Sequence, residues 1–206
     1  SLGDLAHYPT TLGTNRLRAS IAAWLTQRHQ LDSINPDTQI IPVNGSREAL
    51  FSFAQTIVDK HAKLRPVVIC QNPFYQIYEG AALLANAELH FLNSLPENQF
   101  APEWAQISDQ IWARTQLVYV CSPNNPTGRV MTMEEWQNLF ALSDQYGFVI
   151  AADECYSEIY FDEANPPLGA LEAAEKSGRS GFPRLVVFGS LSKRSNVPGL
   201  RSGFVA

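Results

Sequence analysis

A lysine between serines stands directly after an apolar run in the C-terminal part of this chain. Residues 185–188 (LVVF) are typical of a buried strand, and Ser190, Ser192 and Lys193 follow them. Lysine is rarely buried without a partner or a chemical function. An amine at a strand end suits nucleophilic chemistry, in which it forms a Schiff base with an aldehyde cofactor or a carbonyl substrate. Ser190 and Arg201 would be candidate anion contacts beside it, although an isolated SxSK segment is more often a polar surface loop.

Further polar residues fall just after other predicted strands. They are Gly45, Ser46 and Arg47, then Tyr75, Asn125, Asp153 and Tyr156. Each alone has an ordinary explanation as a cap, a turn, a packing residue or an ion-pair partner. In open α/β sheets, however, ligands bind at the edge formed by the carboxyl ends of the strands. The repeated placement of these residues at strand ends therefore indicates a binding site.

Strand-like and helix-like segments alternate along the chain, which favours an α/β sheet with crossover helices. Apolar runs predict strands at residues 39–43, 67–70, 88–91, 117–121, 148–152, 185–188 and 202–206. Helices are predicted over 15–27, after an N-cap at Ser46, around 81–84, and between Thr132 and Gly147. Thr132 and Glu135 have the spacing of a capping box.

Composition narrows the class of protein. The chain has 206 residues, 45% hydrophobic and 17% charged, which suits one globular domain. Its net charge of −5 argues against nucleic acid or an anionic membrane as the main partner. No apolar run approaches a membrane span and the start does not resemble a signal peptide. Cys70, Cys121 and Cys155 favour free thiols in a reducing cytoplasm, and without CxxC or paired histidines we expect no metal site.

The motifs resemble those of the fold-type I, pyridoxal-phosphate-dependent aminotransferases of class I and II. The resemblance runs from Tyr8 to Gly203 and is most specific at residues 122–128 (SPNNPTG), 153–156 (DECY) and 190–201. The segment SLSKRSNVPGLRSGF, residues 190–204, is most similar to the corresponding segment of succinyldiaminopimelate aminotransferases of the lysine pathway. This resemblance implies a three-layer α/β/α sandwich with a mostly parallel, seven-stranded sheet that contains one antiparallel strand.

The resemblance also implies a role for each polar residue. Lys193 matches the lysine that forms the Schiff base and then moves protons as general base and acid. Asp153 matches the carboxylate that pairs with the pyridine nitrogen and keeps it protonated, which makes the ring an electron sink. Asn125 and Tyr156 match the groups that hydrogen-bond the phenolic oxygen of the cofactor. Tyr75 matches the aromatic residue that stacks on the ring.

Phosphate binding is expected from three separate segments. The N–H groups of Ser46 and Arg47 would face the phosphate at a helix N-terminus that Gly45 opens. Ser190 and Arg201 would add a hydroxyl and a guanidinium fork.

Tyr8 matches a tyrosine that reaches the phosphate of the neighbouring subunit in the family. This match predicts a homodimer with shared active sites, and simple packing is the competing role for Tyr8. Arg194 and Cys155 occupy positions that vary within the family, so neither is assigned a role.

Residues 1–206 correspond to the large, cofactor-binding domain of the family. The chain starts at Ser1 rather than a methionine and its last predicted strand stops at Ala206, so we expect a piece of a longer protein. The family's N-terminal segment and its C-terminal small domain, which carries the arginine for the substrate carboxylate, would lie outside it. An isolated large domain can bind the cofactor weakly and be inactive.

Four functions remain open from the sequence. The leading one is an aminotransferase acting on an amino acid and a 2-oxo acid, with succinyldiaminopimelate and 2-oxoglutarate as the candidate pair. A pyridoxal-phosphate-dependent C–S lyase would use almost the same residues. An effector-sensing, aminotransferase-like domain of a transcription regulator would need an upstream winged-helix module, and nothing in the chain is basic enough for one. A phosphate-binding module without pyridoxal is the fourth.

Overall fold

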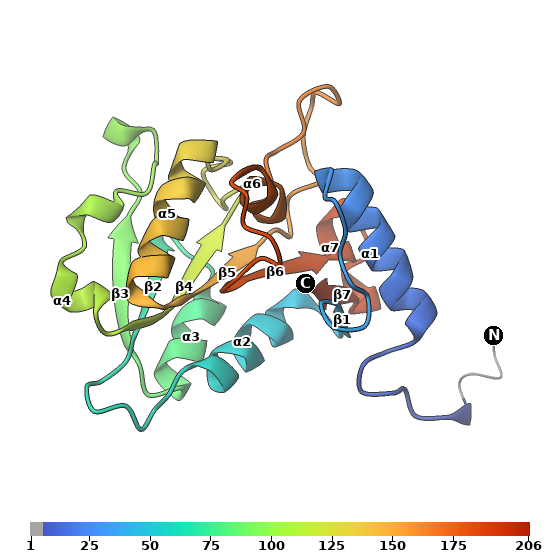
Figure 1. Ribbon diagram of the computed structural model, residues 1–206, viewed down its shortest axis with the longest axis horizontal. Coiled ribbons are helices and arrows are strands. Elements are labelled where there is room, and N and C mark those ends of the chain that lie inside the picture. Colours follow the sequence, from blue (N-terminus) through green and yellow to red (C-terminus); the bar gives the residue numbers. More distant parts are fainter. Residues whose placement is uncertain (1–5) are drawn as a thin grey trace.

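A seven-stranded sheet forms the middle layer of the computed structural model, which describes residues 6–206 (Figure 1). Its strands are β1 (Ile41–Val43), β2 (Val67–Asn72), β3 (Glu88–Asn93), β4 (Thr115–Cys121), β5 (Val149–Asp153), β6 (Leu185–Ser190) and β7 (Gly203–Val205). The order across the sheet is β1-β7-β6-β5-β4-β2-β3. β7 runs antiparallel to both of its neighbours, whereas β2 to β6 pair in parallel. The predicted seven-stranded sheet with one antiparallel strand is therefore confirmed.

Helices cover both faces of this sheet. They are α1 (Asn15–His29), α2 (Ser46–Ile57), α3 (Gln76–Leu84), α4 (Asp109–Trp112), α5 (Met133–Tyr146), α6 (Ala170–Lys176) and α7 (Leu191–Arg194), with short 3₁₀ turns η2 (Pro96–Asn98), η3 (Trp104–Gln106) and η4 (Pro198–Leu200). In the view of Figure 1, α2 and α3 lie below the sheet and α5 and α6 lie above it. No helix in the described part of the chain combines the length and the apolarity needed to cross a membrane.

The strands read as continuous apolar runs because the sheet is buried on both faces. Side chains alternate between two hydrophobic cores along each strand. Val67 and Ile69 of β2 join the core under α1, α5 and α6. Val68 and Cys70 join the core under α2 and α3. This two-sided burial confirms the three-layer α/β/α architecture.

The order of the strands reverses between β2 and β4. From β2 the chain moves outward to the edge strand β3, and from β4 it moves the other way through β5 and β6. The carboxyl ends of parallel strands on either side of such a switch point leave a crevice that ligands occupy. The fold therefore places a site where the polar residues were predicted to converge.

One predicted cap is wrong. Ser46 was expected to cap its helix, but it is the first residue of α2, and Gly45 occupies the N-cap position without any side-chain hydrogen bond. The backbone of Gly45 has φ of 106°, a conformation that glycine adopts without the steric cost other residues meet. The predicted domain, residues 1–206, also includes residues 1–5, which lie outside the described residues.

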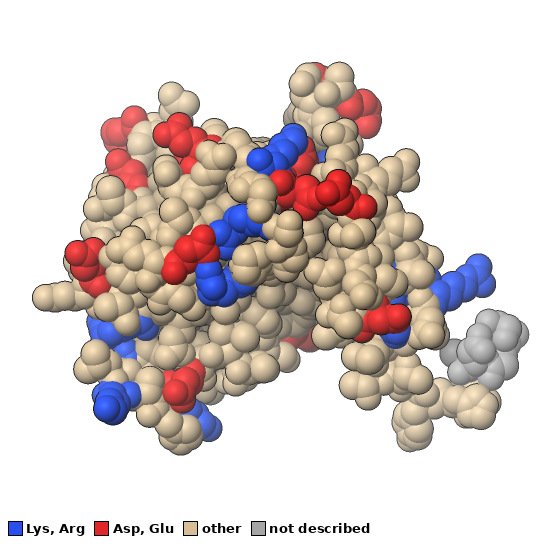
Figure 2. Space-filling model, viewed as in Figure 1, with Lys and Arg blue, Asp and Glu red and all other residues tan. Residues whose placement is uncertain are grey.

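Charge is mixed over the face shown in Figure 2. Lysine and arginine side chains alternate there with aspartate and glutamate. Ion pairs in the described part of the chain include Arg114 with Glu88 at 2.7 Å and Arg28 with Glu158 at 2.8 Å. Positive and negative side chains largely balance on this face, in agreement with the net charge of −5.

The capping box of α5 can be tested by mutation. Thr132 Oγ1 accepts a hydrogen bond from the Glu135 backbone N–H at 3.3 Å, and Glu135 Oε2 accepts one from the Thr132 N–H at 2.8 Å. We expect Thr132→Ala to lower the free energy of unfolding by about 1 kcal/mol, because one helix N–H loses its partner. Urea denaturation measures this change. Thr132→Ser keeps the hydroxyl and is the matched control, so equal losses in the two variants would contradict this explanation.

Candidate active site

A cavity of about 370 Å³ opens at the carboxyl ends of β2, β4, β5 and β6. Most of the predicted site residues line it. They are Ser46, Arg47, Tyr75, Asn125, Asp153, Tyr156, Ser190, Lys193 and Arg201. The sheet brings these side chains together from segments that are far apart in the sequence, as the strand order requires.

Asp153 is the last residue of β5 and is only 3% exposed. Its Oδ2 accepts a hydrogen bond from the Tyr78 hydroxyl at 2.7 Å, and its Oδ1 accepts one from the Cys155 backbone N–H at 3.3 Å. Burial raises the pKa of the Asp153 carboxyl, and the two hydrogen bonds oppose that rise by favouring the charged form. The carboxylate is therefore held in one orientation at the floor of the cavity.

Tyr78 is a site residue that the sequence reasoning missed. It lies on α3, three residues after Tyr75, and its ring stacks on Tyr119 with centroids 4.6 Å apart. Burial raises the pKa of Tyr78 well above its ordinary value, so its hydroxyl keeps its proton and acts as a donor. The spacing of three residues on one helix face was the signal that could have paired it with Tyr75.

Asn125 and Tyr156 meet above the strand ends. Asn125 Nδ2 donates a hydrogen bond to the Tyr156 hydroxyl at 3.3 Å. Tyr75 lies at the N-cap position of α3, with its ring edge-on to Tyr78 at 6.0 Å. These three side chains supply an amide, a phenol and an aromatic face to the same cavity.

An anion cradle lies where α2 begins. Arg201 Nη2 donates to Glu48 Oε2 at 2.7 Å, directly beside the buried Gly45. A Cβ at Gly45 would overlap the Arg201 guanidinium and lie 2.7 Å from Glu48 Oε2. Only a glycine leaves this space open, and Ser46 and Arg47, the first residues of α2, line the same cavity as the Arg201 guanidinium. Helix N-termini favour bound anions. The sequence reasoning missed Glu48, the carboxylate that orients Arg201.

Ser190 completes this side of the cavity. It is the last residue of β6, and its Oγ accepts a hydrogen bond from the Ser192 N–H at 3.1 Å. Because the oxygen is the acceptor in that bond, the hydroxyl hydrogen of Ser190 remains able to donate to a ligand. A hydroxyl, a guanidinium and helix N–H groups form the donor set that a phosphate prefers.

Lys193 lies on the short helix α7 and lines the cavity, but it is exposed rather than buried. The apolar run before it ends inside the sheet, and α7 carries the amine out to the cavity mouth. Arg194, which had no predicted role, places its guanidinium 4.5 Å above the ring of Trp24 on α1. This cation–π contact anchors α7 next to Lys193.

Behind β5 lies a second polar cluster that sequence reasoning did not find. His29 of α1 is buried, with Nε2 4.0 Å from Glu154 and Nδ1 3.9 Å from Glu172. Glu154 also accepts a hydrogen bond from the Ala170 N–H at 2.6 Å, at the start of α6. The cluster ties α1 and α6 to the residue that follows Asp153. Within residues 6–206, no group of three or more His, Cys, Asp or Glu side chains could hold a metal ion.

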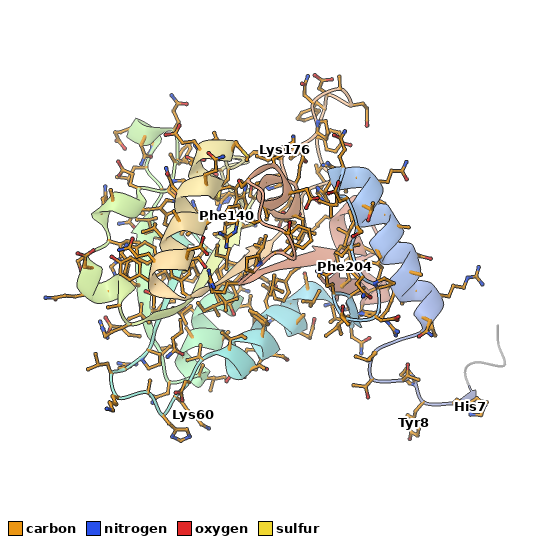
Figure 3. The ribbon with its side chains drawn as sticks, in the orientation of Figure 1. His7, Tyr8, Lys60, Phe140, Lys176 and Phe204 are labelled. Atoms are coloured by element: carbon orange, nitrogen blue, oxygen red, sulfur yellow. The ribbon has the colours of Figure 1, made fainter. Side chains whose placement is uncertain are left out.

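Tyr8 and Gly45 are the predicted site residues that do not line the cavity. Gly45 lies beneath Arg201, as described above. Tyr8 is 99% exposed and projects from the N-terminal segment, well away from the sheet (Figure 3). Its predicted contact with a neighbouring subunit stays a prediction.

A family model and curated relatives that are similar to this chain are all aminotransferases. The family model described as "Aminotransferase class I and II" matches residues 1–206. A relative named LL-diaminopimelate aminotransferase, from Maridesulfovibrio salexigens, is 30% identical over 95% of this chain and 48% of its own length. A relative of the same name from Aquifex aeolicus is 29% identical, with the same coverage of both chains. The chain thus spans about half the length of the curated relatives it matches.

Solved structures are similar over the whole chain. An aminotransferase from Neisseria meningitidis is 55% identical with a TM-score of 0.95, covering 100% of this chain and 51% of the other. The aminotransferase AspB from Helicobacter pylori is 38% identical with a TM-score of 0.89, covering 100% of this chain and 52% of the other.

The cradle at Gly45 leads to a binding prediction. We expect Gly45→Ala to weaken the affinity for pyridoxal phosphate at least about tenfold, because the new methyl group displaces a charge-assisted donor. Titration of the chain with the cofactor, followed by absorbance, measures the change. Gly80→Ala on α3 is the control, since a Cβ there meets nothing within 4 Å. An unchanged affinity in Gly45→Ala would show that Arg201 does not bind the phosphate.

Proposed function

The chain belongs to the class I and II aminotransferases, and on this premise we propose that it forms the cofactor-binding large domain of an enzyme that transfers an amino group between an amino acid and a 2-oxo acid. The observation that carries the proposal is the convergence of Asp153, Lys193 and the Gly45–Arg201 cradle on one cavity. A buried carboxylate, an amine and an anion site at one sheet edge are the parts that such a transfer requires.

The residues present fit pyridoxal phosphate. The cradle at the start of α2 suits the phosphate, and Asp153 at the floor suits a protonated ring nitrogen. When bound, this cofactor supplies an aldehyde for attachment to an amine and a ring that withdraws electrons from the carbon bearing the substrate's amino group.

Each residue then has a defined task. Lys193 would supply the amine that attaches the cofactor and would act as base and acid at the substrate carbon. Asp153 would keep a positive charge on the ring nitrogen, and Asn125 and Tyr156 would donate hydrogen bonds to the phenolic oxygen. Tyr75 would stack on the ring.

The remaining donors hold the phosphate. The N–H groups of Ser46 and Arg47 would stabilise its charge at the start of α2, and the hydroxyl of Ser190 and the guanidinium of Arg201 would fix its orientation. Lys193 lines the same cavity as these donors.

For the substrate, we propose an amino donor of the lysine pathway with 2-oxoglutarate as acceptor. The motif in residues 190–204 supports succinyldiaminopimelate. The relatives named LL-diaminopimelate aminotransferase, at 29 and 30% identity, support LL-diaminopimelate as a second candidate. Assaying both compounds with 2-oxoglutarate separates them. Release of ammonia and pyruvate without a 2-oxo acid would instead indicate a C–S lyase.

We also propose a homodimer, in which Tyr8 of one subunit reaches the phosphate site of the other. The 99% exposure of Tyr8 supports this assembly, because among residues 6–206 no side chain covers its ring. A reducing cytoplasm would suit Cys70, Cys121 and Cys155, which are free thiols.

Lys193 provides the direct test of the proposed function. After incubation with pyridoxal phosphate and reduction with borohydride, we expect a pyridoxyl group on Lys193 and none at this position in Lys193→Ala. Mass spectrometry of the peptides measures the label. Lys60→Ala, at an exposed lysine between α2 and β2 that does not line the cavity (Figure 3), should label like the wild type. A variant without Lys193 that is still labelled to the same extent would refute this assignment.

A further inference from the structure

The Asp153 carboxylate accepts hydrogen bonds of unequal length from Tyr78 and the Cys155 backbone. The Tyr78 hydroxyl lies 2.7 Å from Oδ2, whereas the Cys155 backbone N–H lies 3.3 Å from Oδ1. Both Asp153 and Tyr78 are only 3% exposed, so water screens their interaction weakly. A short hydrogen bond to an ionised acceptor in a low-dielectric interior is among the stronger polar contacts in proteins. Tyr78 is therefore the principal side-chain donor to this carboxylate among the described residues.

The position of Tyr78 is itself fixed by a chain of contacts. Its ring stacks on Tyr119 with an interplanar angle of 13°. The Tyr119 hydroxyl in turn donates to the Leu50 carbonyl of α2 at 2.7 Å. Because α2 also begins at the anion cradle, one continuous path joins the phosphate end of the cavity to Asp153. The hydroxyl of Tyr78 cannot turn away from Asp153 without breaking the stacking.

Resting on the proposed function, we infer that Tyr78 is a positioning residue that holds the Asp153 carboxylate ionised and so keeps the shared proton on the ring nitrogen of the cofactor. A hydrogen bond to a carboxylate lowers its affinity for protons. In a pair that shares one proton, weakening the proton affinity of the carboxylate leaves that proton on the nitrogen. Tyr78 thereby controls how strongly the ring withdraws electrons, without touching the substrate.

The neighbouring titratable groups do not take over this role. Those that share the cavity with Asp153 and Tyr78 are Tyr75 at the start of α3, Tyr119 and Cys121 of β4, Cys155 and Tyr156 after β5, Glu48 and Arg47 of α2, Lys193 of α7, and Arg201. Burial raises the pKa of both thiols, so each keeps its proton. The Cys155 side chain lowers the pKa of Asp153 less than the Tyr78 hydroxyl does. Tyr119 directs its hydroxyl to Leu50 instead.

The first experiment needs no cofactor. In the chain labelled with [¹³Cγ]aspartate, the Asp153 resonance is identified by its absence in Asp153→Asn. We expect Tyr78→Phe, which keeps the stacked ring and loses the donor, to raise the midpoint of the Asp153 titration by about one to two pH units. Tyr146→Phe is the control, because it removes a hydroxyl that bonds Asp109 at 2.8 Å on the surface. An unchanged midpoint in Tyr78→Phe would overturn the inference.

A measurement on the wild-type chain covers the case in which Tyr78→Phe does not fold. The hydroxyl proton of Tyr78 should exchange slowly with water, and its chemical shift should follow the titration of Asp153. A shift that stays constant while Asp153 titrates would contradict the proposed contact.

The second experiment uses pyridoxal phosphate labelled with ¹⁵N in the ring. The ring nitrogen should be protonated in the wild type, and at the same pH its ¹⁵N shift in Tyr78→Phe should move toward that of an unprotonated ring, because the shared proton moves toward the more basic Asp153 carboxylate. The same protonation in both proteins would overturn the inference while leaving the proposed function intact. Failure of the cofactor to bind either protein would refute the proposed function, and the Asp153 titration would then still test the contact with Tyr78.

Discussion

The rest of the site depends on the burial of one carboxylate at the end of a central strand. Asp153 ends β5, in a sheet covered on both faces, and at 3% exposure little solvent reaches it to stabilise a charge. Such a group needs donors from the protein or a cationic ligand, since an unpaired buried charge costs several kcal/mol. Tyr78 and the Cys155 N–H provide the first, and the cavity in front of Asp153 leaves room for the second.

Helices on both faces of the sheet hold the polar groups around Asp153 in position. On one side, α2 and α3 carry the anion cradle and Tyr78, with Tyr119 between them. On the other, α1 and α6 meet the residue after Asp153 through His29 and Glu154. The same helices bury the apolar faces of the sheet, so packing and positioning of the polar groups are achieved by the same contacts. This explains why the site needs the whole three-layer sandwich.

Much of the fold was predictable because local patterns and the final structure agree. The capping box at Thr132 and the left-handed Gly147 were both visible in the sequence and both occur. The cap at Ser46 was predicted wrongly, because the N-cap position has a backbone φ of 106° and lies against the Arg201 guanidinium, a setting that favours Gly45 and that no local pattern reveals. The roles of Tyr78 and Glu48 were missed because their partners are distant in the sequence. Asp153 lies 75 residues from Tyr78, and Arg201 lies 153 residues from Glu48, beyond the reach of any local pattern. The His29–Glu154 contact also joins segments that are far apart in the sequence.

The sequence alone determined the order of strands and helices and the types of residue at the strand ends, including Lys193 and Asp153. These follow from periodicity and from residue chemistry, which are local properties. Only the tertiary structure decided which of these ends meet, that Lys193 is exposed at the cavity mouth, and that Tyr78 donates to Asp153. Those outcomes depend on the strand order and on helix packing across the sheet, where small differences in distance and burial determine which polar groups become partners.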